Sequence, residues 1–257
     1  MGGPPPASGA LLRGQGPVRV FRTEIGGVPV VVKRLAGEAD AVALRRFERE
    51  RRLARLLAHP CLPHLVAEGE DWIAFKALGE ALCEPDVAAR HGDPAALRPL
   101  LAALAGALAF AHARGVVHRD VKPAHVLFDG DMPVLIDFGI AGTPGDDLQR
   151  AELSGSPAWM APEQLAGEPV GPAADIWPLA ALGLYLLTGQ KPYEGEAEAV
   201  LRRRQAGEPP AFTIPASLES GDPVLAGLLR AGLAAAAADR PAAADFARLM
   251  GGASPSP

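Results

Sequence analysis

The spacing of hydrophobic positions divides the chain into a strand-rich first part and a helix-rich remainder. From Leu11 to Leu35, valines recur with the short period of β-strands, and Gly26–Gly27 supplies the residues of a hairpin turn. From Ala39 to Ala58 the pattern is that of a helix rich in Leu, Ala and Arg, and Trp72–Phe75 is a short apolar run typical of a strand. We therefore expect a small β-rich half that also contains one helix.

Helical patterns dominate the rest of the chain. Strands followed by a run of helices favour the α+β class with two lobes, which we place at residues 11–77 and 78–250. Residues 1–10 and 251–257 are rich in Gly, Pro, Ala and Ser and are expected to be flexible tails. The predicted helices are Pro94–Arg114, Pro162–Ala166, Asp175–Leu187, Glu196–Gln205, Pro223–Ala231 and Pro241–Met250.

The densest group of polar residues lies next to a predicted hairpin. The segment His118–His125 precedes the apolar run Val126–Phe128, and a second run, Val134–Ile136, leads into Asp137. A glycine-containing turn between the two runs indicates a β-hairpin. The residue before the first strand of a hairpin lies beside the residue after the second. We therefore expect His125 and Asp137 to be neighbours, about 5 Å apart between Cα atoms if directly opposed.

This hairpin gathers two carboxylates, Asp120 and Asp137, with the cationic Lys122 and the imidazole of His125. Taken singly, each of these side chains has an ordinary interpretation as a turn residue or a solvated loop charge. Taken together they indicate a site for a charged ligand, because strands rarely end in such a cluster without one.

A second pair of opposite charges is expected in the small half. Lys33 ends an apolar strand and is one of only four lysines, beside twenty-one arginines. On the following helix, Glu50 shares a face with Phe47 and Leu53. A carboxylate on an apolar stripe needs a cation, since burial of an unpaired charge is costly. We expect Glu50 to pair with Lys33, since Glu48 shares its face of the helix with Arg52 and is expected to be solvated. The alternative is that Glu50 is a partly exposed acid at the edge of the helix.

Composition excludes several classes of protein. The chain is 49% hydrophobic, which is too apolar for intrinsic disorder. Its longest apolar stretch, Leu100–Ala113, is shorter than the roughly 20 residues of a membrane span. The start of the chain lacks a signal-peptide pattern, and Cys61 and Cys83 make a poor disulfide framework, so we expect a cytoplasmic protein. The net charge of −5 argues against a nucleic-acid partner.

Two groups of arginines are expected to be solvated and not to bind a ligand. The helix that contains Arg45, Arg49 and Arg52 also carries interleaved acids, so we expect a solvated helix face and no nucleic-acid surface. The run Arg202–Arg204 is interpreted in the same way.

Several motifs in the expected order resemble the catalytic domain of eukaryotic-type (Hanks-type) serine/threonine protein kinases of bacteria. The His118-Arg119-Asp120 loop with Lys122 resembles H-R-D-x-K-P, and Asp137-Phe138-Gly139 matches D-F-G. The resemblance runs from about Leu12 to Met250 and implies a bilobal fold with a small β-rich N-lobe and a larger helical C-lobe. Further matches are Gly155–Glu163 to the end of an activation segment, Asp175–Trp177 to the start of a buried central helix, and Asp239–Pro241 to a segment whose arginine usually pairs with the glutamate at 163.

The resemblance implies roles for the charged residues. Lys33 would hold ATP phosphates and pair with Glu50, and Asp137 would bind Mg²⁺. Asp120 would accept the proton of the substrate hydroxyl, and Lys122 would neutralise the transferring phosphoryl group. Gly14 and Gly16 resemble the start of the glycine-rich loop, although the third glycine position reads Arg19 and the register of the loop is open.

One substitution in the catalytic loop changes the expected metal chemistry. The family has asparagine as a second Mg²⁺ ligand where this chain has His125, and the chain contains no asparagine at all. Imidazole suits Mn²⁺ better than Mg²⁺. Two possibilities follow: a working kinase that prefers Mn²⁺, or a pseudokinase that binds nucleotide and regulates a partner.

The resemblance also narrows the substrate. Lys122-Pro123 is similar to serine/threonine kinases, and Ala161–Glu163 favours a protein substrate over a small molecule. Arg119 implies phosphorylation of Thr143 or Ser154, with self-association of copies for trans-autophosphorylation. Ser156 lies at the position that usually contacts substrate, so a structural role is expected for it. A protein partner that carries Ser or Thr is expected, and no membrane partner.

Overall fold

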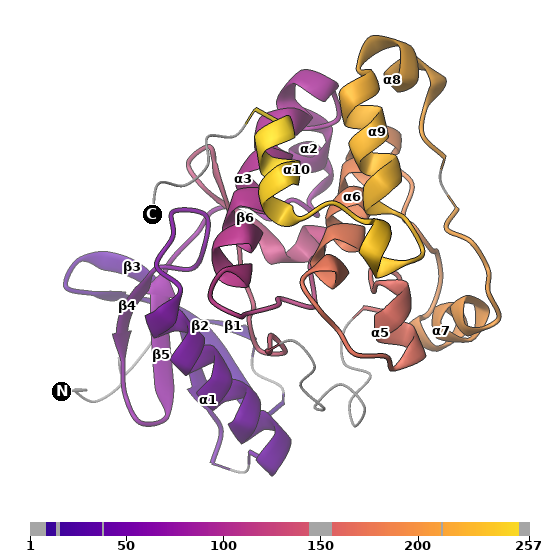
Figure 1. Ribbon diagram of the computed structural model, residues 1–257. Helices are drawn as coiled ribbons and strands as arrows, with labels where there is room; N and C mark the ends of the chain where they lie inside the picture. Colours follow the sequence, from indigo (N-terminus) through magenta and orange to yellow (C-terminus); the bar gives the residue numbers. More distant parts are fainter. Residues whose placement is uncertain (1–8, 14–15, 38, 144–155, 212, 252–257) are drawn as a thin grey trace.

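The first part of the fold is an antiparallel sheet with the strand order β1-β2-β3-β5-β4. The computed structural model describes residues 9–13, 16–37, 39–143, 156–211 and 213–251. Helix α1 (Ala41–Leu56) lies along the sheet (Figure 1). The strands are β1 (Ala10–Arg13), β2 (Val18–Ile25), β3 (Val28–Leu35), β4 (Leu65–Glu68) and β5 (Trp72–Lys76).

The β2–β3 hairpin forms where the sequence predicts it. Gly26 and Gly27 have φ values of 58° and 79°, and the pairing of Ile25 with Val28 makes them a two-residue turn. Two consecutive positive φ values favour glycine, which has no Cβ to clash. The hairpin sets the register of β3, the strand that carries Lys33.

Helix α1 connects the sheet to the rest of the molecule. Its Phe47 lies in a buried cluster with Ile73 and Phe75 of β5. Nearly two turns further on, Leu53 belongs to the hydrophobic core of the helical part. Because Glu50 lies on the same face of the helix, it is only 9% exposed. The apolar stripe thus places this carboxylate between the two lobes.

The helical part is built around α6 (Ala173–Thr188), which is buried along nearly its whole length. A helix that is apolar all round belongs in the centre of a domain. A two-stranded sheet, β6 (Val126–Asp129) and β7 (Met132–Leu135), completes this lobe, with 3₁₀ turns at Pro123–His125 and Ala237–Asp239. The other helices are α2 (Pro85–Arg90), α3 (Pro94–His112), α5 (Pro162–Ala166), α7 (Ala197–Gln205), α8 (Ala216–Gly221), α9 (Pro223–Gly232) and α10 (Ala243–Leu249).

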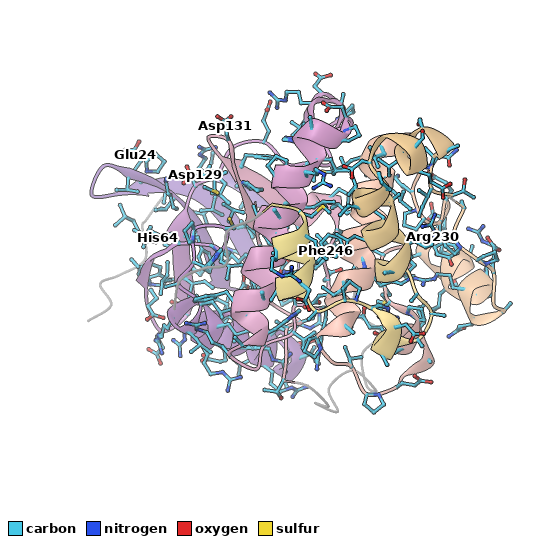
Figure 2. All side chains as sticks on the ribbon, turned by 45° about the horizontal axis from the view of Figure 1, so that its top comes forward. Glu24, His64, Asp129, Asp131, Arg230 and Phe246 are labelled. Atoms are coloured by element: carbon cyan, nitrogen blue, oxygen red, sulfur yellow. The ribbon has the colours of Figure 1, made fainter. Side chains whose placement is uncertain are left out.

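Helix α3, with 19 residues, is the longest helix among the described residues. By length and composition alone it could cross a membrane, but 56% of the apolar window is buried within the fold. It packs against α6 and α10 (Figure 1). Phe246 of α10 points into the packed helices and is fully buried (Figure 2). These contacts make α3 a core helix of the lobe.

The two-lobe architecture agrees with the sequence prediction, and the differences are local. The sequence patterns missed β4, α2 and α8, which have four, six and six residues. Such short elements show no clear hydrophobic period. Helix α10 begins at Ala243 and not at Pro241, because the backbone at Ala242 is still extended.

A buried ion pair ties the end of the expected activation segment to the C-terminal part of the chain. Arg240 donates from Nη1 to Glu163 Oε1 at 2.7 Å and from Nη2 to Glu163 Oε2 at 2.8 Å. The Arg240 side chain is 0% exposed and also donates to three backbone carbonyls, those of residues 173, 234 and 235. The pair expected from the sequence motifs is therefore present and fully satisfied.

Glu163→Gln should lower the free energy of unfolding by about 3 kcal/mol, because it leaves the Arg240 charge buried without its partner. Urea unfolding at neutral pH measures this loss. The matched control is Glu219→Gln, whose partner Arg230 lies at the surface (Figure 2) and which should change stability very little. Equal, small effects of the two substitutions would contradict the prediction.

A second ion pair fixes the start of α9. The Asp222 carboxylate accepts from Arg98 Nε at 2.6 Å and Nη2 at 2.8 Å, and from the backbone N–H of Leu225 at 3.0 Å. The hydrogen bond from Arg98 lowers the pKa of Asp222 to about 2. A depressed carboxyl pKa stabilises the fold above the unfolded-state pKa of about 4, and this contribution is lost as the pH falls toward 2.

Asp222→Asn keeps an N-cap for α9 and removes the charge. We expect the variant to be less stable than the parent at neutral pH and the difference to shrink as pH falls from about 5 to about 3. Thermal unfolding across this range measures it. A difference that stays constant with pH would contradict the proposed ion-pair contribution.

Candidate active site

The polar segment at residues 118–125 is anchored from below by the carboxylate of Asp175, at the start of α6. This fully buried carboxylate accepts from the backbone N–H of His118 at 2.8 Å, the backbone N–H of Arg119 at 2.7 Å and His112 Nε2 at 2.8 Å. Burial raises the pKa of Asp175, but these hydrogen bonds and the charge of His112 outweigh it, so the pKa lies below its usual value. An ionised Asp175 therefore holds the loop in place.

Two features of Arg119 shape the turn before Asp120. The φ of Arg119 is 71°, in the left-handed region that costs a non-glycine residue about 1 kcal/mol or more. The backbone carbonyl of Arg119 accepts from Gln164 Nε2 at 2.9 Å, and Gln164 Oε1 accepts from the backbone N–H of Ala161. Gln164 of α5 thus links the strained turn to the segment before that helix.

Asp120 lies at the open end of this turn, beside Lys122. Lys122 Nζ is 2.8 Å from Asp120 Oδ2 and 3.1 Å from Ser156 Oγ. The side chains of Asp120 and Lys122 are 12% and 16% exposed, so this pair is mostly shielded from water. The Ser156 hydroxyl accepts a hydrogen bond from the same lysine, so it contacts the Asp120–Lys122 pair. A structural role for Ser156 stays a prediction.

His118 connects the turn to the hairpin. Its Nδ1 accepts from the backbone N–H of Asp120 at 3.2 Å, and its Nε2 lies 3.0 Å from the carbonyl of Ile136. Because a backbone N–H can only donate and a carbonyl can only accept, the proton of this imidazole is on Nε2. The edge of Phe138 packs against the same ring.

Asp137 follows β7 and carries the second carboxylate. Its Oδ1 lies 3.8 Å from Lys33 Nζ, and its Oδ2 lies 3.4 Å from His125 Nε2. Burial raises the pKa of Asp137, but the charge of Lys33, with His125 and the backbone N–H of Gly139, brings it well below its usual range. The Asp137 side chain is 42% exposed, so an ionised carboxylate faces solvent here.

The predicted register of the hairpin was wrong by one residue. Strand pairing of Val126 with Leu135 places His125 opposite Ile136, whose N–H donates to the His125 carbonyl at 2.8 Å. Asp137 lies one position beyond and is not directly opposed to His125. The sequence does not show where the second strand ends, which is Leu135 and not Ile136. The side chains of His125 and Asp137 nevertheless meet.

The contacts of His125 leave one ring nitrogen for a cation. His125 Nδ1 lies 2.9 Å from the Asp120 carbonyl and therefore donates its proton there. Burial lowers the pKa of His125 to about 4, although the Asp120 and Asp137 carboxylates oppose this, so the ring is neutral at pH 7. The Nε2 lone pair then faces the Asp137 carboxylate at 3.4 Å. Two electron-pair donors that converge in this way suit a shared cation.

The His125–Asp137 pair fits a metal that takes its other ligands from elsewhere. Within the described residues, no group of three or more His, Cys, Asp or Glu side chains could hold a metal ion. Divalent cations in phosphate-transfer sites are commonly bound by one or two protein side chains together with phosphate oxygens and water.

The Lys33–Glu50 pair joins the sheet to α1. Lys33 Nζ lies 2.5 Å from Glu50 Oε1. Burial raises the pKa of Glu50, and the charge of Lys33 opposes that rise only in part. Glu48 is half-exposed and pairs with Arg51 at 2.8 Å. Glu50 is therefore the acid that faces Lys33.

The expected glycine-rich loop is only partly described. Gly16 lies between β1 and β2 with a φ of 92°, a conformation that favours glycine. Gly14 lies outside the described residues. Arg19 is exposed on β2. The position of Gly16 at a strand turn supports a loop there, and its register stays a prediction.

Six of the predicted site residues form one continuous chain of contacts. The series of contacts starts in the small lobe and ends in the segment 118–125, and each side chain lies within 3.8 Å of the next. In order they are Glu50, Lys33, Asp137, His125, Asp120 and Lys122. Sequence reasoning missed the anchoring role of Asp175 and His112 and the link through Gln164. Asp175 lies in a recognised motif, but no sequence pattern indicated what its carboxylate holds.

Comparison with known proteins finds a family match over most of the chain. Residues 16–245 match the family model described as "Protein kinase domain". The chain is 39% identical over 203 residues to the serine/threonine-protein kinase PkaA of Streptomyces coelicolor, which covers 72% of this chain and 36% of PkaA. It is 36% identical over 230 residues to PknK of Mycobacterium tuberculosis, covering 84% of this chain and 20% of PknK.

A third relative, PknF of Mycobacterium tuberculosis, is 35% identical over 235 residues, which are 83% of this chain and 48% of PknF. The chain therefore spans between about a fifth and a half of the length of these curated relatives. The matched region contains the whole chain of contacts from Glu50 to Lys122. On this evidence the chain belongs to the protein kinase domain family.

Proposed function

We propose that this chain is an ATP-dependent serine/threonine protein kinase. The observation that carries the proposal is the series of side-chain contacts from Glu50 to Lys122, in which carboxylates alternate with basic or imidazole groups. Apart from His125, residues of these types position ATP, the metal ion and the acceptor hydroxyl for phosphoryl transfer in protein kinases. The names of the relatives PkaA and PknK support the serine/threonine assignment.

The position of each site residue suits one role in phosphoryl transfer. Lys33, held between Glu50 and Asp137, would place its ammonium on the ATP phosphates. Asp120 would orient the substrate hydroxyl and accept its proton, and Lys122 would neutralise charge on the transferring group. The catalysis would come from positioning and charge in a poorly hydrated site, not from covalent chemistry. Gly14 and Gly16 would belong to the loop over the phosphates.

We propose that Asp137 and His125 hold the divalent ion. The bound ion would supply positive charge to the phosphates. The neutral ring of His125, with its Nε2 toward Asp137, suits Mn²⁺ better than Mg²⁺, because Mg²⁺ prefers oxygen ligands. The pseudokinase alternative is not favoured, since Asp120, Lys122 and Asp137 keep their side chains in contact range.

A protein is the proposed phosphoryl acceptor, and another copy of the chain is one such acceptor. Arg119 Nη2 donates to the carbonyl of Thr143 at 2.8 Å, so a phosphate on this segment would lie close to a guanidinium. Thr143 is exposed, and Ser154 lies outside the described residues. Autophosphorylation in trans would need self-association. We also propose a cytoplasmic location.

Asp120→Asn should lower phosphoryl transfer from ATP by about 10²-fold to 10⁴-fold while nucleotide binding persists, because it removes the proton acceptor and leaves Lys33 and Asp137 in place. Transfer of labelled phosphate and nucleotide-induced thermal stabilisation measure the two properties. Asp129→Asn, on the exposed hairpin turn, is the control and should keep activity. Phosphopeptide mapping of the labelled parent locates any modified Thr143 or Ser154.

If the parent binds nucleotide and transfers no label with either ion, the kinase proposal is wrong and the regulatory alternative takes its place. If label transfer by Asp120→Asn equals that of the parent, the assignment of Asp120 is wrong.

His125→Asn should shift the preference for Mn²⁺ over Mg²⁺ by about tenfold toward Mg²⁺, because it replaces a nitrogen ligand with an amide oxygen. The ratio of kcat/KM values with the two ions measures the shift. Mn²⁺ affinity of the ADP-bound chain, followed by electron paramagnetic resonance, gives a second readout without turnover. If neither quantity changes, His125 is not a metal ligand.

A further inference from the structure

The three arginines near the end of α7 are not alike. Arg202 is 65% exposed and pairs with Glu198, and Arg203 is 42% exposed and pairs with Glu208. The exposure of these two side chains agrees with the solvated helix face predicted from the sequence. Arg204 does not: its guanidinium turns inward, toward the segment that precedes α5. The interpretation of Arg204 as a solvated charge was therefore wrong.

The guanidinium of Arg204 is bound by carbonyls and aromatic rings. Its Nη1 donates to the carbonyl of Pro157 at 2.6 Å and to the carbonyl of Met160 at 2.7 Å. The same group lies 4.8 Å from the ring centre of Trp177 and 4.5 Å from that of Tyr193. Both rings are buried, and both distances are in the range of cation–π attraction.

No carboxylate of the described part of the chain lies within ion-pair distance of Arg204. Burial lowers the pKa of this guanidinium, and the neighbouring Tyr193 opposes that effect. Arg204 is half-buried, and a cation that is partly removed from water without an anionic partner is costly unless its N–H groups are hydrogen-bonded. Here the donors are used on two carbonyls of one short loop, Ser156–Met160.

That loop leads directly to the proposed phosphoryl-transfer residues. Ser156, at its start, lies 3.1 Å from Lys122 Nζ, which is itself 2.8 Å from Asp120 Oδ2. Within the loop, the Trp159 and Tyr185 rings pack nearly perpendicular to each other, and the backbone N–H of Trp159 donates to the Ser156 carbonyl at 2.8 Å. The loop is thus held at Ser156, at Trp159 and by Arg204.

We infer that Arg204 is a positioning residue that fixes the Ser156–Met160 loop in the shape needed to bind a protein substrate beside Asp120. This inference rests on the proposed kinase function for its effect on substrate. Its structural part, order of the loop, does not depend on activity. The nucleotide residues lie on other elements, β3, α1 and the β6–β7 hairpin. Arg204 should therefore affect binding of the protein acceptor and leave binding of ATP unchanged.

The test compares Arg204→Met with Arg202→Met, an equal change on the exposed side of the same helix. With an equimolar library of nine-residue peptides that carry a central Ser or Thr, the apparent peptide KM of Arg204→Met should rise about tenfold or more, the loss expected for charge-assisted hydrogen bonds. The KM for ATP should stay within about twofold of the parent value. Arg202→Met should change neither.

A second measurement needs no turnover. Hydrogen exchange of the backbone amides in residues 156–165 should be faster in Arg204→Met than in the parent and in Arg202→Met. Arg204→Lys, which keeps a cation over the rings and a donor for a carbonyl, should restore part of the protection and part of the peptide KM.

The outcomes separate the two proposals. A parent chain that transfers no phosphate overturns the proposed function, and the exchange measurement still decides the role of Arg204. Unchanged exchange in Arg204→Met overturns the inference. So does a peptide KM that stays at the parent value, or a rise in both KM values together with a lower melting temperature, which would indicate general loss of the fold.

Discussion

The geometry of the active site depends on one buried carboxylate, that of Asp175. A charge in the core is costly in free energy unless hydrogen bonds replace its hydration. Asp175 meets this condition by accepting two backbone N–H groups from the loop above it and the imidazole of His112 beside it. The same bonds hold Arg119 in a left-handed conformation that it would not adopt alone. The position of Asp120 follows from that turn.

Alternating charges then organise the side of the site where we propose that nucleotide binds. Lys33 lies between the carboxylates of Glu50 and Asp137, and His125 lies between those of Asp137 and Asp120. Each carboxylate is thereby kept beside a cation or a polar ring, except that the exposed side of Asp137 still faces solvent. That exposed side is where the positive charge of a metal ion would be most stabilised. The arrangement is one that an anionic, metal-bearing ligand completes.

The sequence predicts the contacts that follow from a local hydrophobic pattern, but not those that depend on residues brought together only by tertiary folding. The Lys33–Glu50 pair was predictable because a helical period of hydrophobic residues placed a carboxylate on a buried face. The hairpin was predictable from two apolar runs, but its register was not, because the end of the second strand depends on tertiary hydrogen bonds. Arg204 could not be distinguished from Arg202 by pattern, since both lie in one basic run. Its surroundings come from Trp177 and Tyr193, which only the folded chain brings to it.

His118 has a further consequence for how the lobe responds to change. The His118 imidazole links the main chain at Asp120 to the main chain at Ile136, the residue before Asp137, which we propose as a metal ligand. The ring is rigid, and both of its nitrogens are occupied. A shift of the β6–β7 hairpin is therefore transmitted through the His118 ring to the main chain at Asp120, the proposed proton acceptor. Substitutions in the hairpin that displace Ile136 would therefore also displace the turn at Asp120.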